Sequence, residues 1–453
     1  MTYIPPSNLL QKYNVAVPRY TSYPTVPHWQ DHPPARADWK ARVRRAVESQ
    51  SNIAVYAHLP FCERLCTYCG CNTRITRNHG VEDPYIDTLL EEWKLYLDAM
   101  ETTPTVREIH LGGGTPTFFQ PRNLDRFLRR MLLHIPVSED HEFGLEVHPA
   151  TCTKDHLIYL RINGFQRISV GVQDFSESLL KVINRFQTPE EVAQVTKWAR
   201  QLGYRSVNFD LIYGLPKQTL DHIEATMKRV GELRPDRIAF YSYAHVPWLK
   251  NGQRAYSEAD LPTGAEKLAL YERGRALLEY MGYVEIGLDH FALPDDRLTR
   301  AAKSGTLHRN FMGYTPHQTR MTVGLGASAI SDSWDGYVQN EKSVEAYTAR
   351  VAAGVLPYFR GHLLSEQEQS VRRHILNIMC KGFTSWTVEQ ELFERARGRW
   401  QQMAYDGLLT LGPRTVTVTE RGKPFLRNIA AALDPLFDGG LTHETRPMFS
   451  RSV

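Results

Sequence analysis

The chain has 453 residues, of which 42% are hydrophobic, 23% charged and 11% aromatic. At roughly 150 residues per domain this length predicts about three domains, and the balance excludes disorder and collagen-like repeats. Lys and Arg number 54 and Asp and Glu number 50, so the formal net charge of +4 gives no reason to expect nucleic acid as a partner. Apolar runs stay below the ~20 residues of a membrane span and no signal-peptide pattern is visible, so we expect a cytoplasmic protein.

The N-terminal region is rich in proline and aromatic residues and has no lasting period, so we expect an ordered arm and a lead-in helix over residues 1–51. From residue 52 onward, strand-like runs alternate with segments of helical spacing. The six predicted strands are Ile53–Leu59, Glu108–Leu111, Phe143–Val147, Arg167–Val172, Ser206–Ile212 and Arg237–Tyr243.

Helix boundaries support this alternation. Asp83-Pro84 supplies an N-cap and a proline at the first helical position, and a capping box starts at Thr188. Glycines that end helices are Gly164, Gly203 and Gly282. Six βα units predict an α/β fold with a partial (βα)6 barrel over residues 52–355, since a full eight-unit barrel takes ~250 residues. A doubly wound open sheet is the alternative.

The pattern changes near residue 360. An amphipathic helical stretch over 364–382 is followed by the alternating run Thr415–Thr419 and a helix over 422–433. These features predict a smaller α+β domain over residues 356–453, without obvious chemistry of its own.

Four of the six cysteines fall within ten residues, directly after the first predicted strand: Cys62, Cys66, Cys69 and Cys71. Three thiolates at this spacing can each ligate one iron of a cubane, which leaves the fourth iron open unless Cys71 reaches it. An open iron can chelate S-adenosylmethionine (SAM) and deliver the electron that releases a 5′-deoxyadenosyl radical. A zinc site is the alternative, but no second Cys or Cys/His pair follows. The two other cysteines stand alone, and we expect them to be buried and unreactive.

In a parallel barrel the reactive groups sit at the carboxyl ends of the strands. The predicted strand ends carry Tyr56 and His58, Gly112–Pro116, Glu146, Gln173, Asp210 and Ala244. A glycine run lets the backbone approach a ligand, and Glu146 and Asp210 can pair with an ammonium group or accept from ribose hydroxyls. Arg185 can clamp an α-carboxylate. Each of these side chains could instead be solvated or salt-bridged, but their convergence on one rim predicts a binding site.

These motifs closely resemble the oxygen-independent coproporphyrinogen III oxidases of the radical SAM superfamily, and the resemblance runs nearly end to end. The segments that carry it are Tyr20–Thr25, Tyr56–Cys62, Gly112–Thr117, Gly171–Phe175, Asp210–Gln218, Asp289–Phe291, His308–Phe311 and Gly326–Ser331.

The resemblance implies a reaction in oxygen-independent haem biosynthesis. Two propionates of coproporphyrinogen III are oxidatively decarboxylated to vinyls, which gives protoporphyrinogen IX. It also implies a [4Fe-4S] cluster on Cys62, Cys66 and Cys69, with Cys71 present but not ligating. Two SAM molecules, an electron donor of the flavodoxin or ferredoxin type and a monomeric enzyme are further expectations.

The family's cofactor contacts can be carried over by position. Those to the SAM on the cluster fall on Tyr56, Gly113, Glu146 and Ile330. Those to the second SAM fall on Tyr68, Gly114, Thr115, Gln173, Arg185, Asp210 and Ala244. We expect Tyr56 and the three ligating cysteines to take part in catalysis. Two departures are His148, where the family commonly has Asp, and the absence of a cysteine from Arg427–Ala432.

Two other functions are possible on the same fold. A relative that uses its second SAM for methyl transfer, cyclopropanation or haem breakdown would share the two-cofactor site. A haem chaperone is disfavoured, since such proteins usually have Phe at the Cys71 position. Substrate carboxylates could be met by His290, His308 and Arg309, and Tyr20 and Tyr23 could close the barrel mouth.

Overall fold

The structure is a computed structural model that describes residues 9, 12–247, 251–388 and 391–437. Its contacts separate two compact units. The barrel unit consists of Gln30–Leu277 and Thr319–Leu363; the terminal unit consists of the described parts of Met1–Trp29, Leu278–Gln318 and Leu364–Val453. Each unit is assembled from separated segments, whereas the sequence predicted consecutive domains.

Six parallel strands form the central sheet of the barrel unit in the order β1-β4-β5-β6-β7-β8. They are β1 (Asn52–Leu59), β4 (Thr105–Gly113), β5 (Val137–Val147), β6 (Phe165–Gln173), β7 (Ser206–Tyr213) and β8 (Arg237–Ser242). Most of their residues are buried, as strands covered on both faces require. The prediction of a partial (βα)6 barrel is confirmed.

The sheet continues beyond β1. Strand β13 (Met321–Leu325) also pairs in parallel with β1. Three antiparallel strands follow: β14 (Ile330–Asp332), β15 (Gly336–Asn340) and β16 (Tyr358–Leu363). The return from β13 to β14 is tight, because a Cβ on Gly324 would lie 2.4 Å from the Ile330 carbonyl oxygen. Only glycine fits this approach.

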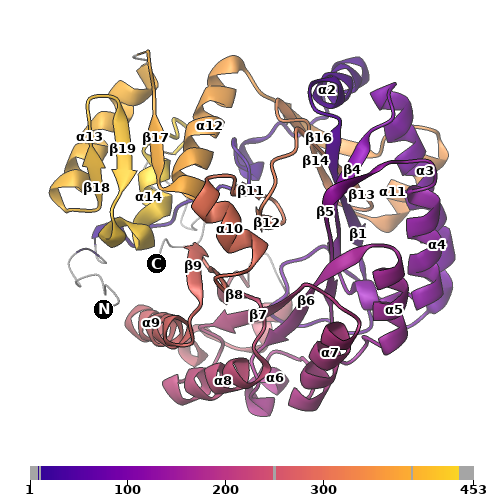
Figure 1. Cartoon of the computed structure of the whole chain (residues 1–453), viewed down its shortest axis with the longest axis horizontal. Helices are drawn as coiled ribbons and strands as arrows, with labels where there is room; N and C mark the ends of the chain where they lie inside the picture. The colour runs from indigo at the N-terminus through magenta and orange to yellow at the C-terminus, as the bar shows by residue number, and fades with distance from the viewer. Residues whose placement is uncertain (1–8, 10–11, 248–250, 389–390, 438–453) are drawn as a thin grey trace. The chain divides into compact units, whose positions relative to one another are not determined.

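Helices connect and cover the strands, and Figure 1 shows α3, α4 and α5 on the outer face of the sheet. The barrel unit contains α2 (Arg36–Ser49), α3 (Glu82–Met100), α4 (Pro121–Met131), α5 (Lys154–Ile162), α6 (Glu177–Val182), α7 (Pro189–Gln201), α8 (Leu220–Leu233), α11 (Val344–Ala352) and most of α9 (Gly264–Tyr280). The capping box at Thr188 is present. The predicted N-cap at Asp83 is wrong, because a 3-10 turn over His79–Val81 runs directly into α3.

The terminal unit is α+β, as predicted for the C-terminal region. Its elements include two hairpins, β9 (Val284–Gly287) with β10 (His290–Ala292) and β11 (His308–Asn310) with β12 (Gly313–Thr315), and α10 (Arg297–Ser304). A three-stranded sheet in the order β17-β19-β18 packs with three helices. These are β17 (Phe383–Ser385), β18 (Leu409–Leu411), β19 (Thr415–Val418), α12 (Glu366–Lys381), α13 (Glu391–Tyr405) and α14 (Leu426–Ala431).

The N-terminal arm contributes to the core of the terminal unit. Tyr20 and Tyr23 are each 2% exposed and belong to one apolar cluster with Trp400. The Tyr20 hydroxyl donates a hydrogen bond to Asp434 Oδ2 at 3.0 Å. Both tyrosines, which we expected at the barrel mouth, are therefore core residues of this unit.

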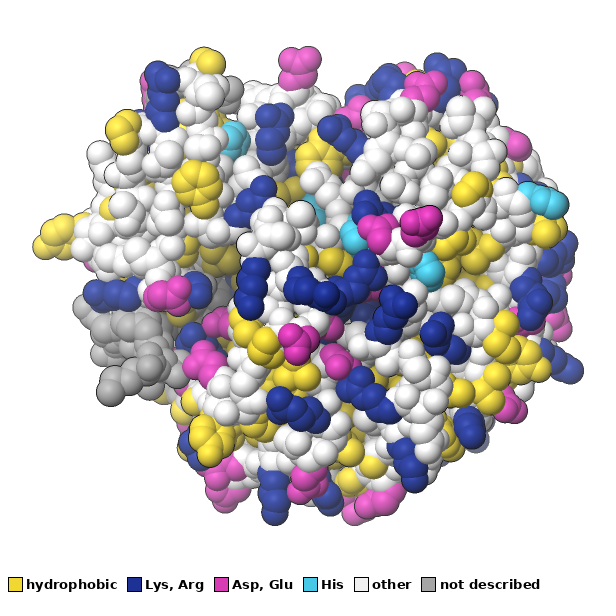
Figure 2. All heavy atoms as spheres, in the orientation of Figure 1, with side chains coloured by type: hydrophobic (Ala, Val, Ile, Leu, Met, Phe, Trp, Pro, Cys, Tyr) yellow, Lys and Arg dark blue, Asp and Glu magenta, His cyan; other side chains and the backbone are white. Residues whose placement is uncertain are grey.

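Basic and acidic side chains both occur across the face shown in Figure 2, in keeping with the nearly balanced composition. Among the described residues, no helix combines the length and apolar character needed to cross a membrane.

Candidate active site

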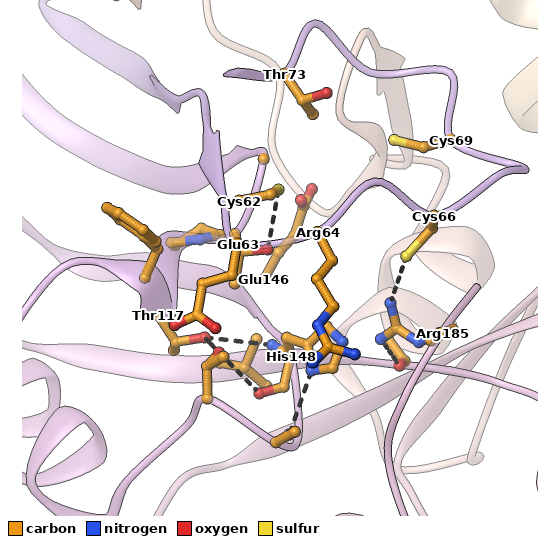
Figure 3. A pocket seen from close by; sticks show the side chains of 18 of the residues that line it. Cys62, Glu63, Arg64, Cys66, Cys69, Thr73, Thr117, Glu146, His148 and Arg185 are labelled. Carbon is orange, nitrogen blue, oxygen red and sulfur yellow. Dashed lines mark hydrogen bonds between the residues drawn. The ribbon is translucent and has the colours of Figure 1, made fainter. Parts of the chain in front are cut away.

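A cavity of about 960 Å³ lies at the carboxyl ends of the barrel strands (Figure 3). Its lining comes from the loop after β1 and from the ends of the other five parallel strands. The predicted site residues that line it are Cys62, Cys66, Tyr68, Cys69, Gly113, Gly114, Thr115, Glu146, Gln173, Arg185 and Asp210. The convergence expected from the strand ends is thus present in the folded chain.

The cysteine loop is tied to the barrel by its backbone. The loop leaves β1 through a short strand, β2 (Phe61–Cys62), which pairs with β3 (Arg74–Ile75). The N–H of Thr115 donates to the Phe61 carbonyl at 3.0 Å, and the N–H of Thr67 donates to the Ile183 carbonyl at 3.0 Å. These bonds fix the start of the loop against the segment after β4 and the middle of the loop against the end of α6.

The thiols of this loop are held in a partly desolvated setting. Burial raises the pKa of Cys62 to about 11, opposed by a hydrogen bond of 3.2 Å between its Sγ and the Thr115 hydroxyl. Burial also raises the pKa of Cys66, opposed by Arg185, whose Nη1 donates to the Cys66 Sγ at 3.8 Å. A hydrogen bond with the Cys69 thiol raises the pKa of Cys71. Metal binding would have to displace the thiol protons.

Glu146 lies at the end of β5 within a defined set of donors. It accepts hydrogen bonds from His110 Nε2 at 3.2 Å and from the N–H of Gly113 at 3.3 Å. Arg167 donates to His110 Nδ1, which leaves the His110 proton on Nε2. Burial raises the pKa of Glu146, but the hydrogen bonds from His110 and from the Gly113 N–H outweigh it, so the pKa is lowered. The resulting carboxylate can pair with an ammonium group.

Gly113 cannot be replaced by another residue without strain. Its φ is +113°, and a Cβ there would lie 2.6 Å from the imidazole of His58. That imidazole is itself fixed, because its Nε2 is bonded to the Asn72 carbonyl at 2.8 Å and its Nδ1 to the Tyr56 hydroxyl at 3.0 Å. The glycine run therefore brings backbone to the cavity wall, as its sequence indicated.

Asp210 and Gln173 lie on the next two strands after β5, Gln173 at the end of β6 and Asp210 in β7. Asp210 accepts hydrogen bonds from the Ser169 hydroxyl and from Asn208 Nδ2, both at 2.8 Å. Burial raises the pKa of Asp210 to about 6, with the bond from Ser169 acting against it. Gln173 adopts a left-handed backbone, with φ of +67°, where β6 ends. Asp210 is therefore mostly ionised at neutral pH and can accept from hydroxyl groups of a ligand.

Most donors of Arg185 are directed at protein atoms. Its Nε donates to Gln187 Oε1 at 2.8 Å, its Nη1 to the Tyr68 hydroxyl at 3.3 Å and its Nη2 to the Gly171 carbonyl. A Cβ on Gly171 would lie 2.9 Å from that Nη2. Arg185 thus supports the cysteine loop and Tyr68 in addition to lining the cavity.

Three predicted site residues are not in the cavity lining. Tyr56 lies just behind it, where its ring stacks on His110 with centroids 6.0 Å apart. The Ala244 carbonyl accepts a hydrogen bond from Gln253 Nε2 at 3.1 Å. Ile330 begins β14 beside Gly324. Missing from the prediction was His110, which an alternation of period two places on the same face as the glycine run.

The thiols fit an iron–sulfur cluster better than a single ion. The described residues contain no group of three or more His, Cys, Asp or Glu side chains placed to hold one metal ion. Three thiolates that each ligate a different iron of a cubane need not meet at one point. Cys62, Cys66 and Cys69 satisfy this looser requirement, since all three line one cavity.

Two of the three carboxylate-binding candidates of the terminal unit, His308 and Arg309, are buried, and His290 is partly buried. Burial lowers the pKa of His308 to about 3, with the charge of Arg372 acting in the same direction. Arg309 is 3% exposed, and its guanidinium lies 4.7 Å from the centroid of the Tyr314 ring. Within the described residues, Arg309 Nη1 is buried without a hydrogen-bond partner.

Comparison with known proteins agrees with this geometry. Residues 56–230 match the radical SAM superfamily. The oxygen-independent coproporphyrinogen III oxidase of Pseudomonas aeruginosa is 36% identical over 458 residues, which cover 99% of this chain and 98% of the relative. The chain belongs to this family.

Two further comparisons extend over the whole fold of the family. The oxygen-independent coproporphyrinogen III oxidase of Escherichia coli is 36% identical over 435 residues, 94% of each chain. A solved structure of the E. coli coproporphyrinogen III oxidase, described as a radical SAM enzyme, superimposes with a TM-score of 0.89 at 33% identity. It covers 96% of this chain and 100% of its own. The methyl-transfer and chaperone alternatives are not favoured by these relatives.

Proposed function

We propose that this chain is an oxygen-independent coproporphyrinogen III oxidase that converts two propionates of coproporphyrinogen III into vinyl groups, yielding protoporphyrinogen IX. One observation carries the proposal. A three-cysteine loop opens onto a cavity built from parallel strand ends, in a chain that matches named oxidases over nearly its full length.

Cys62, Cys66 and Cys69 would hold a [4Fe-4S] cluster. When bound, the cluster and SAM supply one-electron chemistry that removes hydrogen from an unactivated carbon. The chain's part is to bind, orient and exclude water. The Glu146 carboxylate, fixed by His110 and Gly113, is suited to an amino group of SAM.

A second SAM would be met by other groups on the same rim. Asp210 is positioned by Ser169 and Asn208 to accept from ribose hydroxyls. Tyr68 lies within hydrogen-bond distance of Arg185, which keeps its ring at the cavity wall. We assign Gly114, Thr115, Gln173 and Ala244 to the same molecule.

The partners follow from the chemistry. One-electron reduction needs a small donor protein of the flavodoxin or ferredoxin type, and each decarboxylation releases an electron to a terminal acceptor. Free thiols at the cluster loop need a reducing compartment, which supports a cytoplasmic enzyme. We propose that it acts as a monomer.

The test is an anaerobic incubation of the reconstituted protein with SAM, a reductant and coproporphyrinogen III. We expect 5′-deoxyadenosine to form only when the porphyrinogen is present. Cys66→Ser should lose iron and SAM cleavage, while Cys71→Ser, the matched control two residues beyond Cys69, should keep both. SAM cleavage that is unaffected by Cys66→Ser would contradict the assignment of the cluster.

A further inference from the structure

His148 follows β5 directly and occupies a wall of the cavity (Figure 3). Its backbone is fixed by a turn, since its carbonyl accepts from the N–H groups of Thr151 at 3.1 Å and Cys152 at 3.0 Å. Its own N–H donates to the Thr117 hydroxyl at 3.4 Å. The side chain is thus presented to the cavity by a rigid segment.

The two ring nitrogens of His148 differ. Nδ1 accepts a hydrogen bond from the backbone N–H of Ala150 at 3.2 Å, so the proton of the neutral ring lies on Nε2. The described residues offer that Nε2 no hydrogen-bond partner, and it is not one of the polar atoms that are buried away from solvent without a partner. Burial lowers the pKa of His148 well below its ordinary value, with the charge of Arg185 acting in the same direction, so the ring stays neutral at physiological pH.

His156 shows the contrast. It lines the same cavity, but its Nε2 is bonded to the Phe119 carbonyl at 2.8 Å and its Nδ1 to the Thr153 hydroxyl at 2.8 Å. Both of its nitrogens are used by the fold. Of these two histidines, only His148 keeps an N–H, that of Nε2, for a molecule in the cavity.

The electrostatic setting selects the kind of partner. An N–H donor needs an acceptor, and the positive charge of Arg185 acts on the His148 ring. A positive field at a donor favours a negatively charged acceptor and disfavours an ammonium or sulfonium group.

We propose that His148 Nε2–H donates a hydrogen bond to a carboxylate of a molecule bound in this cavity. Two sources supply such a carboxylate, the methionine moiety of SAM and a propionate of the porphyrinogen. The identity of these molecules rests on the proposed function, whereas the donor rests on the geometry of the ring.

Two substitutions at His148 distinguish the role of Nε2 from that of Nδ1. His148→Asn keeps an oxygen that can accept from the Ala150 N–H but loses the distal donor. His148→Gln places an amide N–H near the position of Nε2. SAM affinity is measured by anaerobic equilibrium dialysis on cluster-loaded protein, and the KM for coproporphyrinogen III by initial rates, with iron content and melting temperature recorded for each variant.

We expect His148→Asn either to weaken SAM binding or to raise the KM for coproporphyrinogen III, by about tenfold or more, because a hydrogen bond to a charged group is lost. In His148→Gln both quantities should stay within about threefold of wild type. Weaker SAM binding assigns the carboxylate to SAM; a raised KM with unchanged SAM affinity assigns it to the porphyrinogen. If His148→Asn leaves both within about twofold, the proposal is overturned. Should the wild type not convert coproporphyrinogen, the proposed function fails, and SAM dialysis alone decides the role of His148.

Discussion

The pH dependence of stability at Glu92 tests how α3 is joined to the strands beyond β1. Glu92 is fully buried on α3 and accepts three hydrogen bonds. These come from the Gly326 N–H at 2.8 Å, the Tyr347 hydroxyl at 2.7 Å and Asn340 Nδ2 at 2.7 Å. Burial raises its pKa from 4.5 to about 8, with those hydrogen bonds opposing the shift.

The sign of the pH effect follows from linkage. Between pH 4.5 and 8 the folded chain holds a proton on Glu92 that the unfolded chain has lost, so the contribution to stability is full below pH 4.5 and is lost as pH rises through 8. At ~1.36 kcal/mol per pH unit, and allowing for partial ionisation near pH 8, the loss from pH 6 to pH 8 is about 2 kcal/mol. With ~2.1 cal/mol/K of unfolding entropy per residue, this corresponds to about 2 °C for the whole chain.

Glu92→Gln removes the titration, so we predict that the fall in melting temperature from pH 6 to pH 8 is about 2 °C smaller in this variant than in wild type. Differential scanning calorimetry at both pH values measures the difference, and other titrating groups cancel in the comparison. Glu91→Gln is the matched control, since its side chain is 58% exposed on the same helix and should keep the wild-type slope. Equal slopes in wild type and Glu92→Gln would refute the reasoning.

Three more results are expected. Because the pKa of Asp210 is raised to about 6, SAM affinity should fall about fourfold from pH 7.5 to 5.5 in wild type and stay flat in Asp210→Asn, as dialysis at both pH values would show. Arg237 donates to the buried Glu142 at 3.0 Å and 3.4 Å, so Arg237→Met should cost about 3 kcal/mol in denaturant titrations, and a loss below 0.5 kcal/mol would argue against a buried pair. Deleting residues 1–30 should abolish turnover while iron still loads, because it removes Tyr20 and its neighbours from the core of the terminal unit; unchanged turnover would exclude the arm from the mechanism.

The barrel could be predicted from the sequence because its strands and helix ends are determined by residues that are close together in the chain. Strand runs, the capping box at Thr188 and the glycine exits all appear where the periodicity placed them. The position of the cavity could be predicted in the same way, since the carboxyl ends of parallel strands must share one rim. The resemblance added residues that spacing alone does not reveal, such as Tyr68.

What the sequence did not reveal depends on contacts between distant segments. The burial of Tyr20 arises from packing with a helix some 400 positions later, which no periodicity records. The parallel pairing of β13 with β1 closes a long crossover, and a short strand carries too little pattern to show it. Glu92 resembled an ordinary polar position of an amphipathic helix, because its donors come from three other segments.

The central claim is most directly tested by the mass of the tetrapyrrole after anaerobic incubation with reduced enzyme and SAM. Conversion of each propionate to a vinyl removes carbon dioxide together with two electrons and one proton. We predict a product that has lost two carbon dioxide molecules and four hydrogen atoms, with 5′-deoxyadenosine formed alongside. A porphyrinogen that keeps all four propionates would contradict the oxidase assignment, and so would one that gains a methyl group while S-adenosylhomocysteine accumulates. In either case only the assignment of the cluster and its cavity would still be supported.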